Sequence, residues 1–89
     1  MSNKRRSEIQ IIGEILDLSK HGAKKTEILY QNNMSFSQLQ DYLSYLSKYG
    51  LIKENVISNN NGLVHRVFTT TEKGNNLLVD INKIMTYFK

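Results

Sequence analysis

The sequence contains no cysteine and no long apolar run. Without cysteine, the chain can form neither a disulfide nor a zinc site with thiolate ligands. A membrane-spanning helix needs about 20 consecutive apolar residues, and the sequence has no such stretch. Met1 to Arg6 leads into an amphipathic segment and not into the apolar part of a signal peptide. We therefore expect a cytoplasmic protein without a membrane partner.

Aromatic residues are few, at 9% of the chain, and the hydrophobic content of 39% is modest. A chain of 89 residues has room for one compact core, so we expect a single domain over residues 1–89. Its core should consist mostly of isoleucine and leucine, and a partner chain can cover part of the apolar surface.

The motifs of a catalytic or metal site are also missing. The five glycines form no phosphate-binding loop, and no serine or acidic pair has a recognisable catalytic partner. His21 and His65 are the two histidines, and without cysteine they do not make a convincing metal site together. We expect neither an enzyme nor a cofactor.

Apolar residues at helical spacing predict two helices in the first third of the chain. The first runs from about Ser7 to Lys20, and Gly22 follows it as a stop signal. The second runs from about Lys24 to Asn32 and ends at two asparagines, which tolerate a left-handed turn.

A third helix begins at Ser35, where Ser-Phe-Ser-Gln forms a capping box. Leucines spaced by four and three residues predict its buried seam, and Gly50 ends it. The buried leucines are Leu39, Leu43 and Leu46. The opposite face is polar and carries no arginine.

An antiparallel hairpin is predicted after the third helix. Residues from Leu51 to Ser58 and from Leu63 to Thr69 are rich in β-branched and apolar types. The intervening Asn59, Asn60, Asn61 and Gly62 are a strong turn signal.

A last helix begins at Thr71 and continues over residues 71–89. Gly74 in its first turns indicates close packing against a neighbouring backbone. Its apolar positions match a heptad seam, which predicts a dimer interface, although they could also simply pack on the first helix. The predicted interface residues are Leu77, Leu78, Ile81, Ile84, Met85 and Phe88.

The order helix, helix, helix, hairpin, helix resembles that of small archaeal winged-helix proteins, which are predicted transcriptional regulators. The resemblance rests on Gly-Ala-Lys-Lys-Thr-Glu-Ile (22–28), Leu-X-X-Tyr-Leu (39–43), Lys-Tyr-Gly-Leu-Ile (48–52) and Thr-Glu-Lys-Gly (71–74). These proteins are related to a small archaeal chromatin protein that dimerises through a C-terminal helix, which is much longer there than here.

The resemblance implies a winged helix-turn-helix, mainly α, with a two-stranded hairpin wing and a C-terminal dimerisation helix. It implies a homodimer that binds double-stranded DNA and regulates transcription, with the third helix in the major groove. The residues expected to read bases are Ser37, Gln38, Gln40, Asp41 and Ser44. The residues expected to bind phosphate are Arg5, Arg6, Lys24, Lys25 and Arg66, while the wing tip consists of Asn59, Asn60 and Asn61.

Two other functions stay open. The chain could be an architectural chromatin protein with little sequence preference, or a winged-helix module for protein–protein interaction. The net charge of +4 favours a polyanionic partner only mildly, and the same charges could simply be solvated. Asp41 would lie unfavourably close to phosphates unless it accepted a hydrogen bond from a cytosine amino group.

Overall fold

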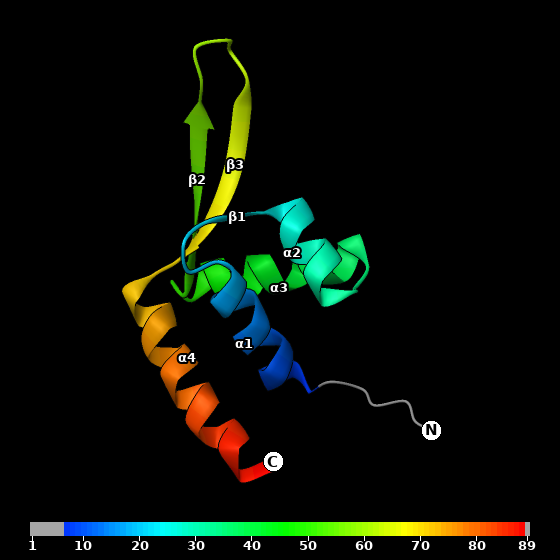
Figure 1. The fold of residues 1–89 in the computed structure, drawn as a ribbon, viewed down its shortest axis with the longest axis vertical. Coiled ribbons are helices and arrows are strands. Elements are labelled where there is room, and N and C mark those ends of the chain that lie inside the picture. Colours follow the sequence, from blue (N-terminus) through cyan, green and yellow to red (C-terminus); the bar gives the residue numbers. More distant parts are fainter. Residues whose placement is uncertain (1–6, 89) are drawn as a thin grey trace.

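The computed structural model describes residues 7–88. In chain order its elements are α1 (Glu8–Leu18), β1 (Ala23–Lys24), α2 (Lys25–Asn32), α3 (Phe36–Lys48), β2 (Ile52–Ser58), β3 (Val64–Thr70), α4 (Glu72–Met85) and a 3₁₀ helix (Thr86–Phe88). The hairpin of β2 and β3, here called the wing, projects from the body formed by the helices (Figure 1). The predicted winged-helix order of elements is confirmed.

The sheet has three antiparallel strands in the order β1-β3-β2. β2 and β3 pair along their full length, whereas β1 contributes two residues, with Ala23 opposite Phe68. The sequence did not predict β1, because two residues are too few to show the periodicity of a strand. As a result of this pairing, the chain that enters α2 is hydrogen-bonded to the base of the wing.

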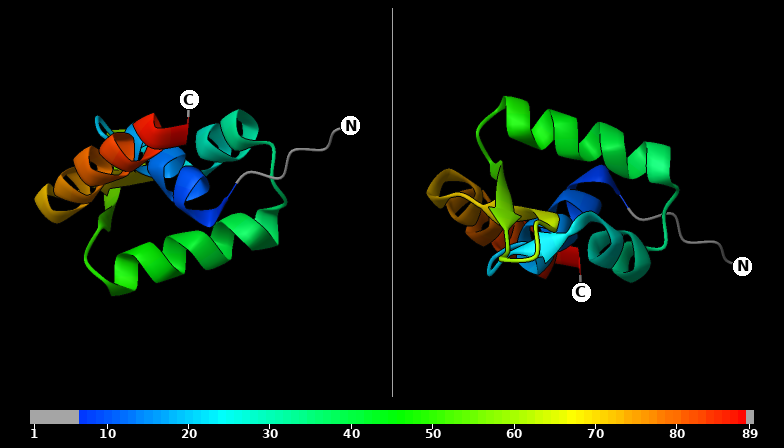
Figure 2. Two further views of the ribbon diagram at one scale, coloured as in Figure 1. Left: turned by 90° about the horizontal axis from the view of Figure 1, so that it is seen from below. Right: turned by 90° about the horizontal axis from the view of Figure 1, so that it is seen from above.

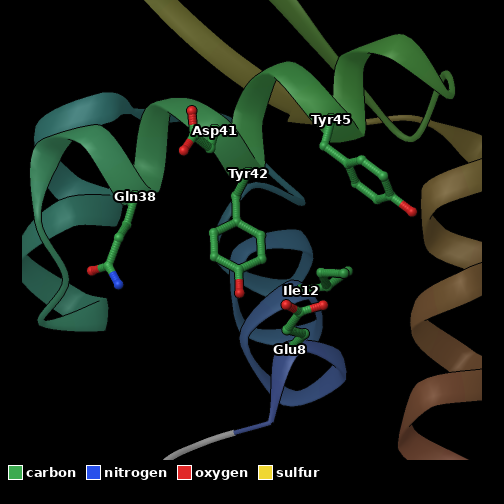
Figure 3. A pocket seen from close by; sticks show the side chains of 6 residues that line it. All are labelled: Glu8, Ile12, Gln38, Asp41, Tyr42 and Tyr45. Atoms are coloured by element: carbon green, nitrogen blue, oxygen red, sulfur yellow. The ribbon is translucent and has the colours of Figure 1, made fainter.

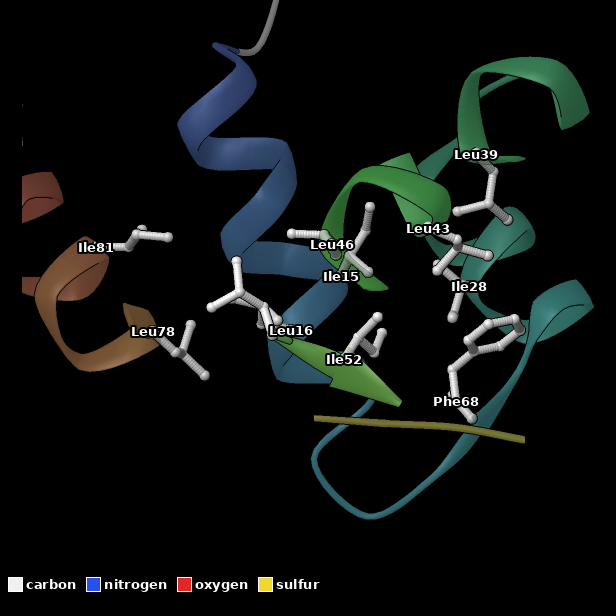
Figure 4. Packing of buried hydrophobic residues seen from close by; sticks show 12 residues of the cluster. Ile15, Leu16, Ile28, Leu39, Leu43, Leu46, Ile52, Phe68, Leu78 and Ile81 are labelled. Atoms are coloured by element: carbon white, nitrogen blue, oxygen red, sulfur yellow. The ribbon is translucent and has the colours of Figure 1, made fainter. Parts of the chain in front are cut away.

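The core is centred on α1, which lies between α3 and α4 (Figure 2). Side chains from these helices meet those from α2 and the base of the wing (Figure 4). The buried hydrophobic residues are Ile15, Leu16, Ala23, Ile28, Leu39, Leu43, Leu46, Leu51, Ile52, Phe68, Leu78 and Ile81. All except Ala23 and Phe68 are isoleucine or leucine, so the predicted composition of the core is confirmed.

The contact between α4 and α1 corrects two of the predicted dimer-interface positions. Leu78 and Ile81 are only 4% and 3% exposed, because their side chains belong to the core of their own chain. Gly13 permits the close approach, since a Cβ there would lie 3.0 Å from Cγ2 of Ile81. Leu77 and Met85 also pack partly against this core. A helix stripe facing a core and one facing a second chain have similar spacing, which explains the wrong assignment.

The end of α3 and the start of α4 are joined by hydrogen bonds to three consecutive carbonyl groups, which we call the α3–α4 junction. Nζ of Lys73 donates to the carbonyl of Tyr49 at 2.8 Å. Oγ1 of Thr71 donates to the carbonyl of Gly50 at 2.6 Å, and the amide of Thr71 donates to the carbonyl of Leu51 at 3.1 Å. Of these carbonyls, that of Tyr49 lies at the C-cap of α3, where a helix leaves carbonyls unpaired, and the other two belong to the chain that leaves the helix.

Gly74 lies where the first turn of α4 meets the chain that leaves α3. A Cβ at this position would overlap the carbonyl oxygen of Leu51 and would lie 2.7 Å from Cγ2 of Thr70. The amide of Gly74 donates to the hydroxyl of Thr71 at 3.0 Å, which confirms the predicted N-cap. The close backbone approach predicted at Gly74 is also confirmed.

We expect Gly74→Ala to lower the free energy of unfolding by about 2 kcal/mol, because backbone must move to admit the methyl group. Gly13→Ala is the matched control, since its methyl group meets only the side chain of Ile81 and no backbone. Alanine also favours the helix over glycine by about 1 kcal/mol. Urea denaturation at one fixed protein concentration measures the free energy of unfolding of both variants and of the wild type. An equal or smaller loss for Gly74→Ala would contradict the backbone clash.

Candidate nucleic-acid interface

The capping box predicted at the start of α3 is confirmed. The hydroxyl of Ser35 accepts from the amide of Gln38 at 3.1 Å, and Oε1 of Gln38 accepts from the amide of Ser35 at 3.1 Å. Asn33 adopts the left-handed conformation between α2 and α3, with φ of 51°. The tight turn and the cap together fix the direction in which α3 leaves α2.

The two flanks of α3 lie in different surroundings. Leu39, Leu43 and Leu46 form its buried seam, as predicted. Gln40 and Ser44 lie on the flank that faces the wing. Gln38 and Asp41 lie on the other flank, toward α1, so the predicted base-reading residues are divided. Ser37 is exposed in the first turn, and its hydroxyl lies 3.4 Å from that of Ser35.

The wing-side flank borders a hollow of about 310 Å³ between α3, β2 and β3, here called the α3–wing groove. Its apolar lining comes from Leu43 and Phe68, which belong to the core cluster. Its polar lining is Lys25, Gln40, Ser44, Ser47, Glu54 and Arg66. The groove therefore combines two cations with uncharged donors and acceptors of the kind that bind base edges.

Both cations of the groove have partners within the chain. Nζ of Lys25 donates to Oε1 of Gln40 at 2.6 Å and lies 4.9 Å from the centre of the Phe36 ring. Nη1 of Arg66 lies 3.3 Å from Oε2 of Glu54. The sequence did not single out Glu54, although the hairpin register places it diagonally opposite Arg66 on one face of the wing.

Lys24 differs from Lys25 in position and surroundings. It belongs to β1 and immediately precedes α2, and its side chain is exposed. Its backbone amide donates to Oε1 of Glu27 at 2.8 Å. The carboxylate of Glu27 therefore already occupies part of the anion-favouring end of α2, where the sequence predicted phosphate binding.

The wing tip is organised by Asn59. Its Oδ1 accepts from the amides of Asn61 and Leu63, both at 3.0 Å. Gly62 adopts the left-handed conformation that completes the turn, with φ of 79°. Asn60 and Asn61 are exposed, whereas the side chain of Asn59 is used within the tip itself.

A second hollow, of about 440 Å³, lies on the α1 side of α3 (Figure 3). Its lining residues are Glu8, Ile12, Gln38, Asp41, Tyr42 and Tyr45. The two charged residues among them, Glu8 and Asp41, are both acidic. The α3–wing groove thus holds two cations and the carboxylate of Glu54, a net charge of +1, whereas the hollow on the α1 side is lined by two carboxylates and no cation, so a polyanion is favoured on the wing side.

Some predicted positions cannot be placed. Arg5 and Arg6 lie outside the described residues. Between residues 7 and 88 no three histidine, aspartate or glutamate side chains gather as a metal site. None of the helices in this part of the chain has the length and apolar character needed to cross a bilayer.

Comparison with known proteins identifies the family. The model of a family described as winged helix-turn-helix matches residues 5–89. The chain belongs to this family. An uncharacterized protein of Methanocaldococcus jannaschii is 36% identical over 52 residues, covering 57% of this chain and 54% of the relative. The chain thus spans about half the length of the curated relative that it matches. This archaeal relative agrees with the predicted resemblance.

Several solved structures share the winged-helix fold. A PadR-like transcriptional regulator from Bacillus cereus has a TM-score of 0.79 at 18% identity, over 88% of this chain and 82% of that one. Sso10a-2, a DNA-binding protein from Sulfolobus solfataricus, has a TM-score of 0.73 at 24% identity, over 92% and 81%. Bacillus subtilis PadR in complex with operator DNA has a TM-score of 0.66 at 20% identity, over 79% and 46%.

We expect Ser35→Ala to lower the free energy of unfolding by about 1 kcal/mol, because the amide of Gln38 at the start of α3 loses the hydroxyl that accepts its hydrogen bond. Ser47→Ala serves as the control, because Ser47 is an exposed residue near the opposite end of the same helix. Thermal unfolding followed by circular dichroism compares the two variants. Equal midpoints would show that the capping box does not stabilise α3.

Proposed function

We propose that this chain is a dimeric DNA-binding transcriptional regulator that acts in the cytoplasm as a single winged-helix domain. The observation that carries the proposal is the charge asymmetry of α3. Lys25 and Arg66 line the groove on its wing side with one carboxylate, Glu54, which leaves a net charge of +1, whereas Glu8 and Asp41 give the hollow on its other side a charge of −2. The winged-helix fold shared with PadR bound to operator DNA and with the DNA-binding protein Sso10a-2 supports the same partner.

In this proposal α3 enters the major groove with its wing-side flank toward the bases. Gln40 can pair with adenine through two hydrogen bonds, and the hydroxyls of Ser44 and Ser37 can serve several bases. Gln38 and Asp41 are left out, because they line the hollow on the α1 side, where the carboxylate of Glu8 lies and no cation is among the lining residues. This choice removes the unfavourable proximity of Asp41 to phosphate that the sequence alone suggested.

The wing would then follow the flanking backbone. Arg66 lines the groove, and Lys24 is an exposed cation on the neighbouring strand β1, opposite Val67. Both would contact phosphates without reading sequence. Arg5 and Arg6 could add further contacts to the backbone. At the wing tip, Asn60 and Asn61 have exposed amides that suit phosphate or the minor groove.

The groove favours a sequence-selective protein over an architectural one. Uncharged polar side chains, Gln40, Ser44 and Ser47, make up half of its polar lining, and one of the three charged residues is the carboxylate of Glu54. A surface that bound any DNA sequence through phosphate alone would gain from more cations and would be weakened by a carboxylate.

The dimer would form through the exposed end of α4 and the 3₁₀ helix that follows it. Ile84 is 44% exposed and Phe88 is 76% exposed, so both remain available after the monomer core is complete. The first turn of α1 reaches the same end of the molecule as the end of α4 (Figure 1), and it carries the exposed Ile9. Two-fold symmetry would place the two α3 helices on half-sites roughly 34 Å apart, or a multiple of this.

DNA binding is tested by selecting duplexes from a random pool and then titrating them across salt concentrations. We expect Lys24→Met with Arg66→Met to weaken binding to all duplexes and to reduce the slope of log affinity against log salt by about 1 to 2, because up to two phosphate contacts are lost. Lys83→Met, on α4, is the control and should leave the slope unchanged.

Three outcomes of this titration decide between the functions. Recovery of a common motif supports the regulator. Equal affinity for every duplex would replace it with the architectural alternative. If the wild-type chain bound no DNA at all, the protein-interaction module would be the better account.

Dimerisation is tested separately by sedimentation equilibrium. We expect Ile84→Ser with Phe88→Ser to give a monomer, because the apolar surface beyond the core is lost. Val79→Ser is the matched control, since Val79 is 52% exposed on the opposite flank of α4 and should not alter the association. A wild-type chain that stayed monomeric at high concentration would refute the proposed interface.

A further inference from the structure

Three side chains from two helices form a hydrogen-bonded chain along the α3–wing groove. Nζ of Lys25 donates to Oε1 of Gln40 at 2.6 Å, and Nε2 of Gln40 donates to Oγ of Ser44 at 3.4 Å. All three line the groove on the wing side of α3. The chain connects the first residue of α2 with the middle of α3.

Lys25 is held from two sides, unlike its neighbour in sequence. Its ammonium contacts the Gln40 amide and lies over the ring of Phe36, and its side chain is half-buried. A cation over an aromatic face and against an amide oxygen is attracted by both. Lys24 is exposed and forms no ion pair with another residue of the range 7–88. The two lysines therefore have different roles available to them.

The contact with Lys25 fixes which way the Gln40 amide points. If the amide were rotated by half a turn, its NH₂ group would face the ammonium, donor against donor. An amide oxygen accepts two hydrogen bonds and an amide NH₂ donates two. After the bonds to Lys25 and Ser44, Gln40 keeps one acceptor and one donor.

One acceptor and one donor, in a fixed order, are what the major-groove edge of adenine requires. The N6 amino group donates to the amide oxygen, and N7 accepts from the amide nitrogen. We propose that Lys25 is a positioning residue that orients Gln40, and that Lys25, Gln40 and Ser44 together select adenine at one position of the bound DNA. This inference rests on the proposed DNA binding and adds the base and the residue that sets its orientation.

The test compares Lys25→Met with Lys24→Met on duplexes selected by the wild-type chain. Both variants lose one positive charge at adjacent positions, and methionine keeps an unbranched side chain that is shorter than lysine by one heavy atom. The measured quantity is the affinity ratio between the selected duplex and one in which the adenine most important to the wild type is replaced. A variant enters the comparison only when its circular dichroism spectrum and thermal midpoint match those of the wild type.

We expect Gln40→Ala to reduce this ratio roughly tenfold, because the bidentate contact is lost. Lys25→Met should reduce it about three- to tenfold, since the amide loses its fixed orientation. Lys24→Met should weaken both duplexes equally and leave the ratio unchanged. Lys25→Arg, which preserves the charge and donors, should restore most of the discrimination.

A double-mutant cycle separates positioning from a simple effect of charge. In the Gln40→Ala background, Lys25→Met should cause no further loss of discrimination, because no amide remains to be oriented. Equal, uniform weakening by Lys24→Met and Lys25→Met would overturn the inference while leaving DNA binding intact. Wild-type binding without sequence preference would overturn it in the same way. Absence of any wild-type binding would instead refute the proposed function.

Discussion

The α3–α4 junction is the constraint on which the rest of the structure depends. The carbonyls of Tyr49, Gly50 and Leu51 all accept hydrogen bonds from the first residues of α4 or its N-cap. Gly74 brings the backbone of α4 so close to Leu51 that a side chain could not fit between them. These contacts leave little freedom for α4 to slide or rotate against α3, so the orientation of one helix determines that of the other.

This constraint matters because the two helices have different proposed tasks. If α4 pairs with a second chain and α3 enters DNA, the junction transmits the geometry of the dimer to the spacing of the two half-sites. The buried hydroxyl of Thr70 supports the same arrangement, since it donates to the carbonyl of Leu16 at 2.6 Å and thereby ties the end of β3 to α1. A rigid monomer of this kind suits a fixed half-site spacing better than a variable one.

The helix boundaries were predictable from the sequence because they depend on local chemistry. The contacts between elements were harder to predict because they depend on long-range packing. Ser35 and Thr71 predict the starts of α3 and α4, because an N-cap bonds only to residues a few positions away in the sequence. The assignment of Leu78 and Ile81 failed because their spacing does not reveal which helix covers them. The division of the α3 face was not predictable for a similar reason.

That division depends on where the folded wing lies beside α3. Periodicity within α3 shows which residues avoid the core, but it does not show which flank meets β2 and β3. The contact between Lys25 and Gln40 joins residues 15 positions apart, and it exists because the turn at Asn33 sets α2 against α3. The pairing of Glu54 with Arg66 could have been predicted more readily from the sequence, since the turn at the wing tip fixes the register of the hairpin.

The two cations of the groove differ in how readily they can exchange partners. Arg66 is exposed and its pair with Glu54 is a surface contact, and such pairs contribute about 0 to 1 kcal/mol. Leaving Glu54 for a phosphate would therefore cost Arg66 little. Lys25 would have to give up a short hydrogen bond to Gln40 and its position over Phe36. The energetic difference favours Arg66 as the cation that moves to the DNA backbone and Lys25 as the one that stays, holding the Gln40 amide in place while α3 meets the bases.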